Sequence, residues 1–216
     1  MSVAESGALG IQYQSLEQQH RTARLGMWVF LSTEVMLFGG LFAAYTIYRT
    51  VYPQGFAEGS RHMNLWLGGA NTAILIVSSL TMALAVRSAQ HGEQSKLIRW
   101  LIVSAVIGGI FLAIKGAEYY EHYVDGLVPA LAWHYDGPLP QQVQIFMLAY
   151  FAMTGLHALH LTIAVVLVSI MASMGRGGTF TPAYYAPIES IGLYWHFVDI
   201  IWIFLLPLLY LFGLQT

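Results

Sequence analysis

Five long apolar segments constrain this chain more than any other feature of its sequence. They run from about 25 to 48, 65 to 86, 97 to 118, 143 to 173 and 192 to 212. Each is long enough to cross the hydrocarbon core of a bilayer as a helix, which takes about 20 apolar residues. Soluble domains carry about 25% charged residues, whereas this chain is 9% charged and 57% hydrophobic. The sequence therefore predicts an all-α protein, a polytopic membrane bundle of five transmembrane helices.

The polar and basic residues predict how the bundle is organised. Residues 1–23 form a polar N-terminal tail, and residues 24–216 form a single five-helix transmembrane domain. Lys and Arg concentrate in cytoplasmic loops. With the N-terminus inside, six basic residues lie inside (Arg21, Arg24, Arg87, Lys96, Arg99 and Arg176) and two outside (Arg49 and Arg61). This asymmetry predicts that the N-terminus is inside and the C-terminus outside.

Composition also excludes several function classes. The chain has no cysteine, so disulfides, thiolate metal sites and thiol catalysis are excluded. Its net charge is −2, and it has no basic run of the kind that binds nucleic acid. No nucleophile with its base, phosphate-binding loop or closed set of metal ligands is recognisable. The residues alone predict a helical membrane protein with polar groups inside it, and they do not predict an enzyme.

Three ionisable residues lie inside the first and last apolar segments. The last segment, GLYWHFVDIIWIFLLPLLYLF, holds His196 and Asp199 near its start, and the first holds Glu34 at a similar depth. Intramembrane ionisable residues favour a functional hypothesis. Because their depths match, the three side chains could face one polar pocket. The alternatives are structural: Glu34 as a neutral acid bonded to a backbone carbonyl or hydroxyl, and His196 with Asp199 as a clamp between helices.

Two further histidines, His157 and His160, lie three residues apart in the fourth segment. Imidazoles in a helical bundle can ligate haem or a metal ion. However, these two share one face at different heights, whereas two haem-ligating histidines need opposing helices at one height. Hydrogen-bonded structural histidines are therefore favoured over a metal site.

The third segment ends in KGAEYYEH, a mixture of charged and aromatic residues. Lys115 and Glu118 are three residues apart and can pair on one helix face, with Lys115 snorkelling outward. Tyr119 suits the aromatic belt at a membrane surface. With Glu121, these residues predict a helix end anchored at the outer interface, or a site for a cation or lipid headgroup. The same segment carries a row of small residues that would admit a neighbouring helix closely: Ala105, Gly109, Ala113 and Ala117.

Four motifs, one per helix and in this order, resemble a known family. They are LGMWVFLSTEVMLFGGLF, FLAIKGAEYYE, GLHALHL and YWHFVDIIWIFLL. Together they are similar to subunit III of the haem–copper terminal oxidases, the cytochrome c oxidase subunit III family, in its five-helix form.

The resemblance implies a non-catalytic role that spacing alone could not indicate. Subunit III of this family binds no cofactor, and haem and copper are expected in the partner subunits. It packs against subunit I in a complex that includes subunit II, holds phospholipids in a cleft and supports proton uptake during oxygen reduction. The implied location is a bacterial cytoplasmic membrane, where the complex could join a larger respiratory supercomplex.

The resemblance also assigns residues. Glu34 falls at the family's intramembrane glutamate, which reacts with hydrophobic carbodiimides. Signatures on the last two helices match five residues: His157, His160, Trp195, His196 and Asp199. Glu118 and Glu121 match the helix end of the third segment. The seven-helix form has two further helices that line the lipid cleft, so another polypeptide would have to supply that wall here.

Alternatives remain open at the level of sequence. Five-helix relatives also occur in quinol oxidases, and a related accessory subunit accompanies nitric oxide reductase. A stand-alone haem-binding membrane anchor would use His157, His160 and His196 as ligands. A small transporter would show an inverted repeat and broken helices, and the chain shows no such repeat.

Overall fold

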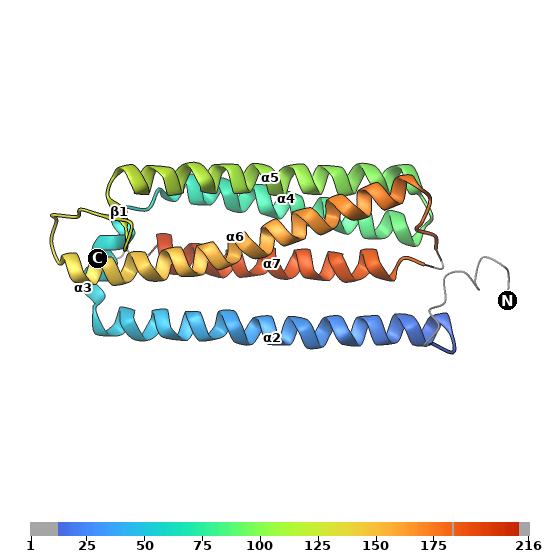
Figure 1. Ribbon diagram of the computed structural model, residues 1–216, viewed down its shortest axis with the longest axis horizontal. Coiled ribbons are helices and arrows are strands. Elements are labelled where there is room, and N and C mark those ends of the chain that lie inside the picture. Colours follow the sequence, from blue (N-terminus) through green and yellow to red (C-terminus); the bar gives the residue numbers. More distant parts are fainter. Residues whose placement is uncertain (1–12, 183, 212–216) are drawn as a thin grey trace.

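The computed structural model describes residues 13–182 and 184–211 of the chain. Five of its helices are long and apolar enough to cross a membrane. These are α2 (Leu16–Val51), α4 (Leu65–Gln90), α5 (Gln94–Val124), α6 (Pro140–Arg176) and α7 (Ala186–Tyr210) (Figure 1). A short helix, α3 (Pro53–Arg61), follows α2, and a small hairpin of β1 (Leu127–Val128) and β2 (Ala132–Trp133) follows α5. The predicted all-α, five-helix class is confirmed, while the orientation of the termini stays a prediction.

Local capping explains where several helices begin. α2 begins at Leu16, within the predicted polar tail, because the Ser15 hydroxyl accepts the backbone N–H of Gln18 at 3.2 Å. Asn64 caps α4 in the same way through the N–H of Leu67, at 3.1 Å. Side-chain acceptors of this kind satisfy N–H groups that have no partner inside the helix. Residues 1–12 of the predicted tail lie outside the described residues.

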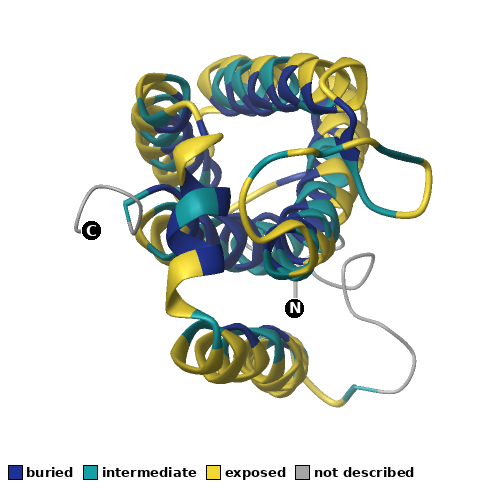
Figure 2. Cartoon of the chain, turned by 90° about the vertical axis from the view of Figure 1, so that its left-hand side faces the viewer, coloured by how far each residue is buried: buried dark blue, intermediate teal, exposed yellow. Residues whose placement is uncertain are grey.

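Four of the long helices form a closed bundle, and α2 stands beside it. The bundle follows the order α4, α5, α6, α7, with α7 also packing on α4. α2 contacts α7 and, more sparsely, α6. In the end view of Figure 2, α2 lies apart from the other four helices and is exposed over most of its circumference. Most of the surface that α2 presents is therefore available to lipid or to another polypeptide.

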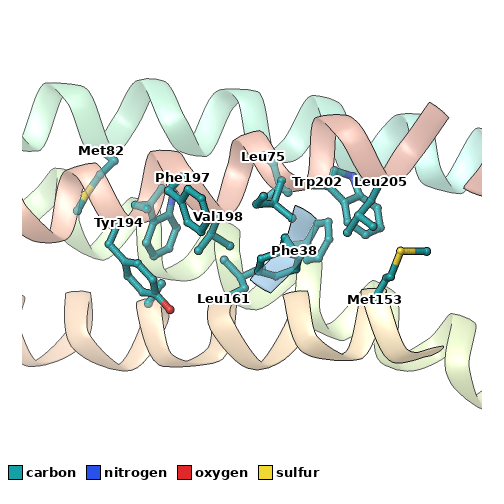
Figure 3. Packing of buried hydrophobic residues seen from close by; sticks show 14 of the residues in the cluster. Phe38, Leu75, Met82, Met153, Leu161, Tyr194, Phe197, Val198, Trp202 and Leu205 are labelled. Atoms are coloured by element: carbon teal, nitrogen blue, oxygen red, sulfur yellow. The ribbon is translucent and has the colours of Figure 1, made fainter. Parts of the chain in front are cut away.

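Aromatic side chains fill the centre of the bundle. The rings of Trp202 and Phe111 meet edge to face with centroids 4.8 Å apart, and Trp195 and Trp202 are fully buried. Phe38 reaches from α2 into this region, where Figure 3 shows it beside Leu161 and Val198. Each indole N–H finds a hydroxyl on α4: Trp195 donates to Ser78 and Trp202 donates to Thr72, both at 3.0 Å.

The close approach of helices at α5 uses a different glycine from the predicted one. A Cβ atom on Gly108 would lie 2.8 Å from Val165 and 2.9 Å from Trp195, so only glycine fits there. A Cβ atom on Gly109 would meet nothing within 4 Å, and Ala113 and Ala117 are exposed. Gly109, Ala113 and Ala117 of the predicted row therefore lie off the closely packed face of α5, which is rotated by one residue.

The last turn of α7 is held by side chains from two other helices. Tyr45 of α2 donates to the Leu208 carbonyl at 2.5 Å, and Ser60 of α3 donates to the Leu209 carbonyl at 2.8 Å. Carbonyls in the last turn of a helix have no partner within it. These two bonds give two of those carbonyls a partner and connect α2, α3 and α7 at the end of the bundle where α7 ends.

The opposite end of the bundle holds the tight turn between α4 and α5. Gly92 adopts a φ of 71°, which favours glycine. Lys96 then bonds the Glu93 carboxylate at 2.8 Å. This hydrogen bond holds the pKa of the Glu93 carboxyl below its usual value. Both side chains are largely exposed, so we expect this pair to add little stability.

Candidate functional site

Three separate groups of ionisable and hydroxyl side chains lie inside the bundle. The acid–imidazole pair is Glu34 of α2 with His160 of α6. The mid-membrane pocket lies between α4 and α7 and contains Ser79, His196 and Asp199. The lysine cluster lies near one end of the bundle and consists of Lys115, Glu118, Tyr150 and Tyr210.

The acid–imidazole pair joins α2 to α6 at the middle of both helices. Oε2 of Glu34 lies 2.9 Å from Nε2 of His160, and the Glu34 side chain is 14% exposed. The other ring nitrogen of His160 lies 2.8 Å from the Leu156 carbonyl. Phe38 contacts the imidazole ring with centroids 5.3 Å apart. The pair is thus largely shielded by apolar groups.

The bonding pattern of His160 fixes how many protons the pair holds. A carbonyl can only accept, so Nδ1 of His160 carries a proton that it donates to Leu156. The Nε2 contact with Glu34 then requires a second proton, either on the carboxyl group or on the ring. In both forms the pair is electrically neutral as a whole. Glu34 and His160 can therefore share a proton near the centre of the membrane without creating a net charge.

The prediction that Glu34 shares a pocket with His196 and Asp199 differs from the structure. Glu34 bonds His160, and the pocket beside His196 and Asp199 is lined by α4 and α7 residues only. The reason lies in the rotation of α7. Tyr194 and Phe197 contact α2 residues, at Phe30 and Phe38 respectively, and this turns the faces of His196 and Asp199 toward α4.

The mid-membrane pocket has an apolar wall and a polar base. Nδ1 of His196 lies 2.7 Å from the Ser79 hydroxyl. Asp199 is 4% exposed, and neither of its carboxylate oxygens has a hydrogen-bond partner among the described residues. The pocket has a volume of about 390 Å³ and is otherwise lined by five aliphatic residues: Leu75, Ile76, Leu80, Ile200 and Ile203.

The lysine cluster is a buried ion pair bridged by two tyrosine hydroxyls. The Lys115 ammonium lies 3.1 Å from Oε2 of Glu118 and donates to the Tyr150 and Tyr210 hydroxyls, both at 2.9 Å. Each hydroxyl in turn donates to Oε1 of Glu118, at 2.6 and 2.5 Å. Each tyrosine hydroxyl therefore accepts from the ammonium and donates to the carboxylate, so both hydroxyls connect the two charged groups. The cluster links α5, α6 and the end of α7.

The prediction that Lys115 snorkels outward is wrong. Lys115 is 3% exposed and Glu118 is 2% exposed, because the pair faces Tyr150 and Tyr210 inside the bundle. Tyr119 is partly buried and bonds Thr154 of α6 at 2.6 Å. Among the four residues predicted at the outer interface, Glu121 is exposed. Lys115 and Glu118 follow the buried face of α5 rather than the aromatic belt.

The remaining predicted residues have packing partners. His157 is buried with its ring 5.6 Å from Phe111 and 5.1 Å from Trp202, and its nitrogens have no hydrogen-bond partner within the described part of the chain. Trp195 packs against α4 through Ser78. Across residues 13–182 and 184–211, no group of three or more His, Asp or Glu residues is arranged to hold a metal ion.

Three partners of these clusters were not predicted from the sequence: Ser79, Tyr150 and Tyr210. A hydroxyl residue in a membrane helix usually bonds its own backbone, so it gives no signal by itself. For Tyr150 a signal did exist, because it continues the buried face of α6 at helical spacing through Thr154 and His157. Tyr210 is brought to Lys115 only by the packing of α7.

The chain is similar in sequence to a known family over most of its length. The chain matches the family described as Cytochrome c oxidase subunit III over residues 3–214. A protein of Synechocystis sp. named cytochrome c oxidase subunit 3 is 34% identical over 187 residues, which cover 86% of this chain and 74% of that protein. A probable cytochrome c oxidase subunit 3 of Mycobacterium leprae is also 34% identical, covering 86% of each chain.

A third relative carries a different electron donor in its name. The cytochrome bo(3) ubiquinol oxidase subunit 3 of Pseudomonas putida is 28% identical over 189 residues, which cover 88% of this chain and 85% of that protein. Both kinds of relative are third subunits of terminal oxidases. The match extends over nearly the whole chain, including all five long helices. The chain therefore belongs to the cytochrome c oxidase subunit III family.

Proposed function

We propose that this chain is the non-catalytic subunit III of a haem–copper oxidase that takes electrons from cytochrome c. In this proposal it packs against subunit I in a complex with subunit II, and those partners carry the haem and copper. The named cytochrome c oxidase relatives are 34% identical to the chain, against 28% for the ubiquinol oxidase relative. This difference favours cytochrome c as the donor, and quinol remains the second candidate.

The observation that carries a role in proton uptake is the acid–imidazole pair. A proton shared between Glu34 and His160 stays bound near the membrane centre without a net charge, and its transfer from one group to the other leaves the net charge of the pair unchanged. Glu34 of this pair lies on α2, which is the least buried of the five long helices. We infer that it supports proton supply to the catalytic subunit and so prolongs the active lifetime of the complex.

A groove between α2 and α6 supports the proposal of lipid binding. It has a volume of about 280 Å³ and is lined by apolar and tyrosine side chains of both helices, including Leu41, Tyr45, Leu148 and Met153. Such a lining suits an acyl chain of a phospholipid. Because α2 has little protein around it here, a neighbouring polypeptide would complete the groove.

The proposed location is a bacterial cytoplasmic membrane, with the N-terminus inside and the C-terminus outside. With five spanning helices, the start of α2 and the end of α7 lie at opposite ends of the bundle (Figure 1). The excess of Lys and Arg at the end that holds the α4–α5 turn supports this orientation.

A tagged chain purified from native membranes in mild detergent tests the proposal. We expect a haem–copper catalytic subunit in equal amount, together with a subunit II that binds copper if cytochrome c is the donor. If the copurified subunit II contains no copper, the proposed electron donor is quinol rather than cytochrome c. Recovery of nitric oxide reductase subunits, or of no partner, would contradict the proposal.

Turnover of the purified complex tests the role of the acid–imidazole pair. Glu34→Gln removes the exchangeable proton but keeps a hydrogen-bonding group of the same shape. We expect the complex to assemble and then to lose activity in fewer turnovers than wild type. Thr162→Ala, on the exposed side of α6, is the matched control. If the Glu34→Gln complex stays active for as many turnovers as wild type, the proposed role in proton supply is wrong.

A further inference from the structure

The mid-membrane pocket presents a buried acid that has no hydrogen-bond partner among the residues that the structure describes. Ser79 and Asp199 lie near the midpoints of α4 and α7, and Asp199 is about 20 Å from the start of its helix at 1.5 Å per residue. Neither oxygen of Asp199 is hydrogen-bonded within the described chain. The hydroxyl of its polar neighbour Ser79 lies 2.7 Å from Nδ1 of His196. A buried carboxyl without partners is costly in apolar surroundings, whether neutral or charged.

The surroundings narrow down what can satisfy this acid. Phospholipid headgroups lie at the membrane surfaces, about 15 Å from the centre of a 30 Å hydrocarbon core, so they do not reach Asp199. Acyl chains reach it but carry no hydrogen-bonding group at that depth. A transmembrane helix of another protein can bring a polar side chain to the middle of the membrane, and such interhelical bonds contribute to association there.

We propose that the face formed by α4 and α7 is the docking site for a transmembrane helix of a partner subunit. That helix inserts a side chain with a hydrogen-bond donor, such as Arg, Lys, Trp or Tyr, into the mid-membrane pocket, where it bonds Asp199. This inference rests on the proposed function, because it assumes that the chain works in a complex. It deepens that function by assigning the contact to a specific face and a specific acid.

The chemistry of the pocket matches such a donor. The carboxyl group of Asp199 offers two accepting oxygens, and the imidazole of His196 is partly exposed beside it. The rim is aliphatic and open to the outside: Ile76 and Ile200 are each at least 50% exposed on either side of the pocket. In such a site the central polar contact sets the position of the partner, and the surrounding contacts exclude water from it.

Photocrosslinking in the assembled complex tests the docking site. A benzophenone amino acid at Ile200 reports what lies against the pocket rim, and the same probe at Val106, an exposed residue near the middle of α5, is the control. We expect Ile200 to form an adduct with a transmembrane segment of one oxidase subunit that carries a donor side chain near the adduct. Val106 should not form that adduct.

A variant series at Asp199 tests the proposed bond. We expect Asp199→Leu to lower retention of that subunit in mild detergent by about threefold or more, the effect of losing one interhelical hydrogen bond. Asp199→Asn keeps a hydrogen-bonding group and should retain more of the subunit than Asp199→Leu. Thr162→Leu, which replaces a hydroxyl at similar depth on the exposed side of α6, should have no effect.

The outcomes separate this inference from the proposed function. Ile200 adducts with lipid or a small molecule alone, or the same protein adduct from Val106, would overturn the docking site. Copurification of the oxidase subunits with such a result would leave the proposed function intact and place the interface elsewhere. If Asp199→Leu fails to accumulate, the crosslinking experiment still decides, because it leaves Asp199 in place.

Discussion

Nε2 of His160 lies 2.9 Å from Oε2 of Glu34, and this contact joins the exposed helix α2 to the bundle at mid-membrane. The other ring nitrogen of His160, Nδ1, donates its proton to the Leu156 carbonyl. The contact between Nε2 and Glu34 must therefore hold a further proton. A polar contact between two loosely packed helices, in a region that lipid or a partner can reach, combines an attachment point with a store for one proton.

Carbodiimide labelling should report this pair. A hydrophobic carbodiimide reacts with a protonated carboxyl in an apolar region, and Glu34 is more accessible than the other membrane acids, Glu118 and Asp199. We expect Glu34→Gln to abolish labelling of this chain and Asp199→Asn to leave it unchanged, as measured by mass spectrometry of the labelled peptides. Labelling that persists in Glu34→Gln would identify a different reactive acid.

The lysine cluster should be sensitive to the loss of either charge. Lys115→Met leaves Glu118 buried without its counter-ion, which we expect to lower the free energy of unfolding by about 3–5 kcal/mol. Denaturation of the purified chain in detergent measures this change. Glu121→Gln removes an exposed carboxylate on the same helix and should change the free energy by less than about 0.5 kcal/mol.

A double variant distinguishes a charge effect from a packing effect in this cluster. Lys115→Met combined with Glu118→Gln removes both charges, so it should cost less than the sum of the two single changes. An additive double variant would mean that the two side chains act independently, contrary to the 3.1 Å contact between them.

The cap on the last turn of α7 gives a prediction about helix docking. Tyr45→Phe removes the hydroxyl that bonds the Leu208 carbonyl and should lower stability by about 1–3 kcal/mol, because a buried carbonyl loses its partner. The thermal unfolding temperature of the purified chain measures the change. Tyr48→Phe, one turn along on an exposed site, should leave that temperature nearly unchanged.

Adjacent glycines on α5 should respond in opposite directions. Gly108→Ala places a Cβ atom 2.8 Å from Val165 and 2.9 Å from Trp195, so we expect it to be destabilising by about 1–3 kcal/mol through overpacking. Gly109→Ala has free space and should be neutral or stabilising by up to about 1 kcal/mol, since alanine favours a helix. If the two substitutions change stability equally, Gly108 does not lie on the closely packed face of α5.

The sequence by itself determined the number and type of the spanning elements and the family. Length and continuity of apolar residues decide whether a segment crosses a membrane, because each backbone polar group must be bonded within its own helix. The four motifs also carried the family resemblance, which the match over residues 3–214 confirmed. These are properties of single segments and of their order along the chain.

Only the tertiary structure decided which polar residues meet. The similar depths of Glu34 and Asp199 in the membrane suggested that the two side chains face each other. The rotation of α7 instead turns Asp199 toward α4, and Glu34 bonds His160. Position near a helix end suggested that Lys115 reaches the surface, yet Tyr150 and Tyr210 enclose it. Depth follows from counting residues along one helix, whereas partners depend on the rotation and packing of several helices, which no single segment encodes.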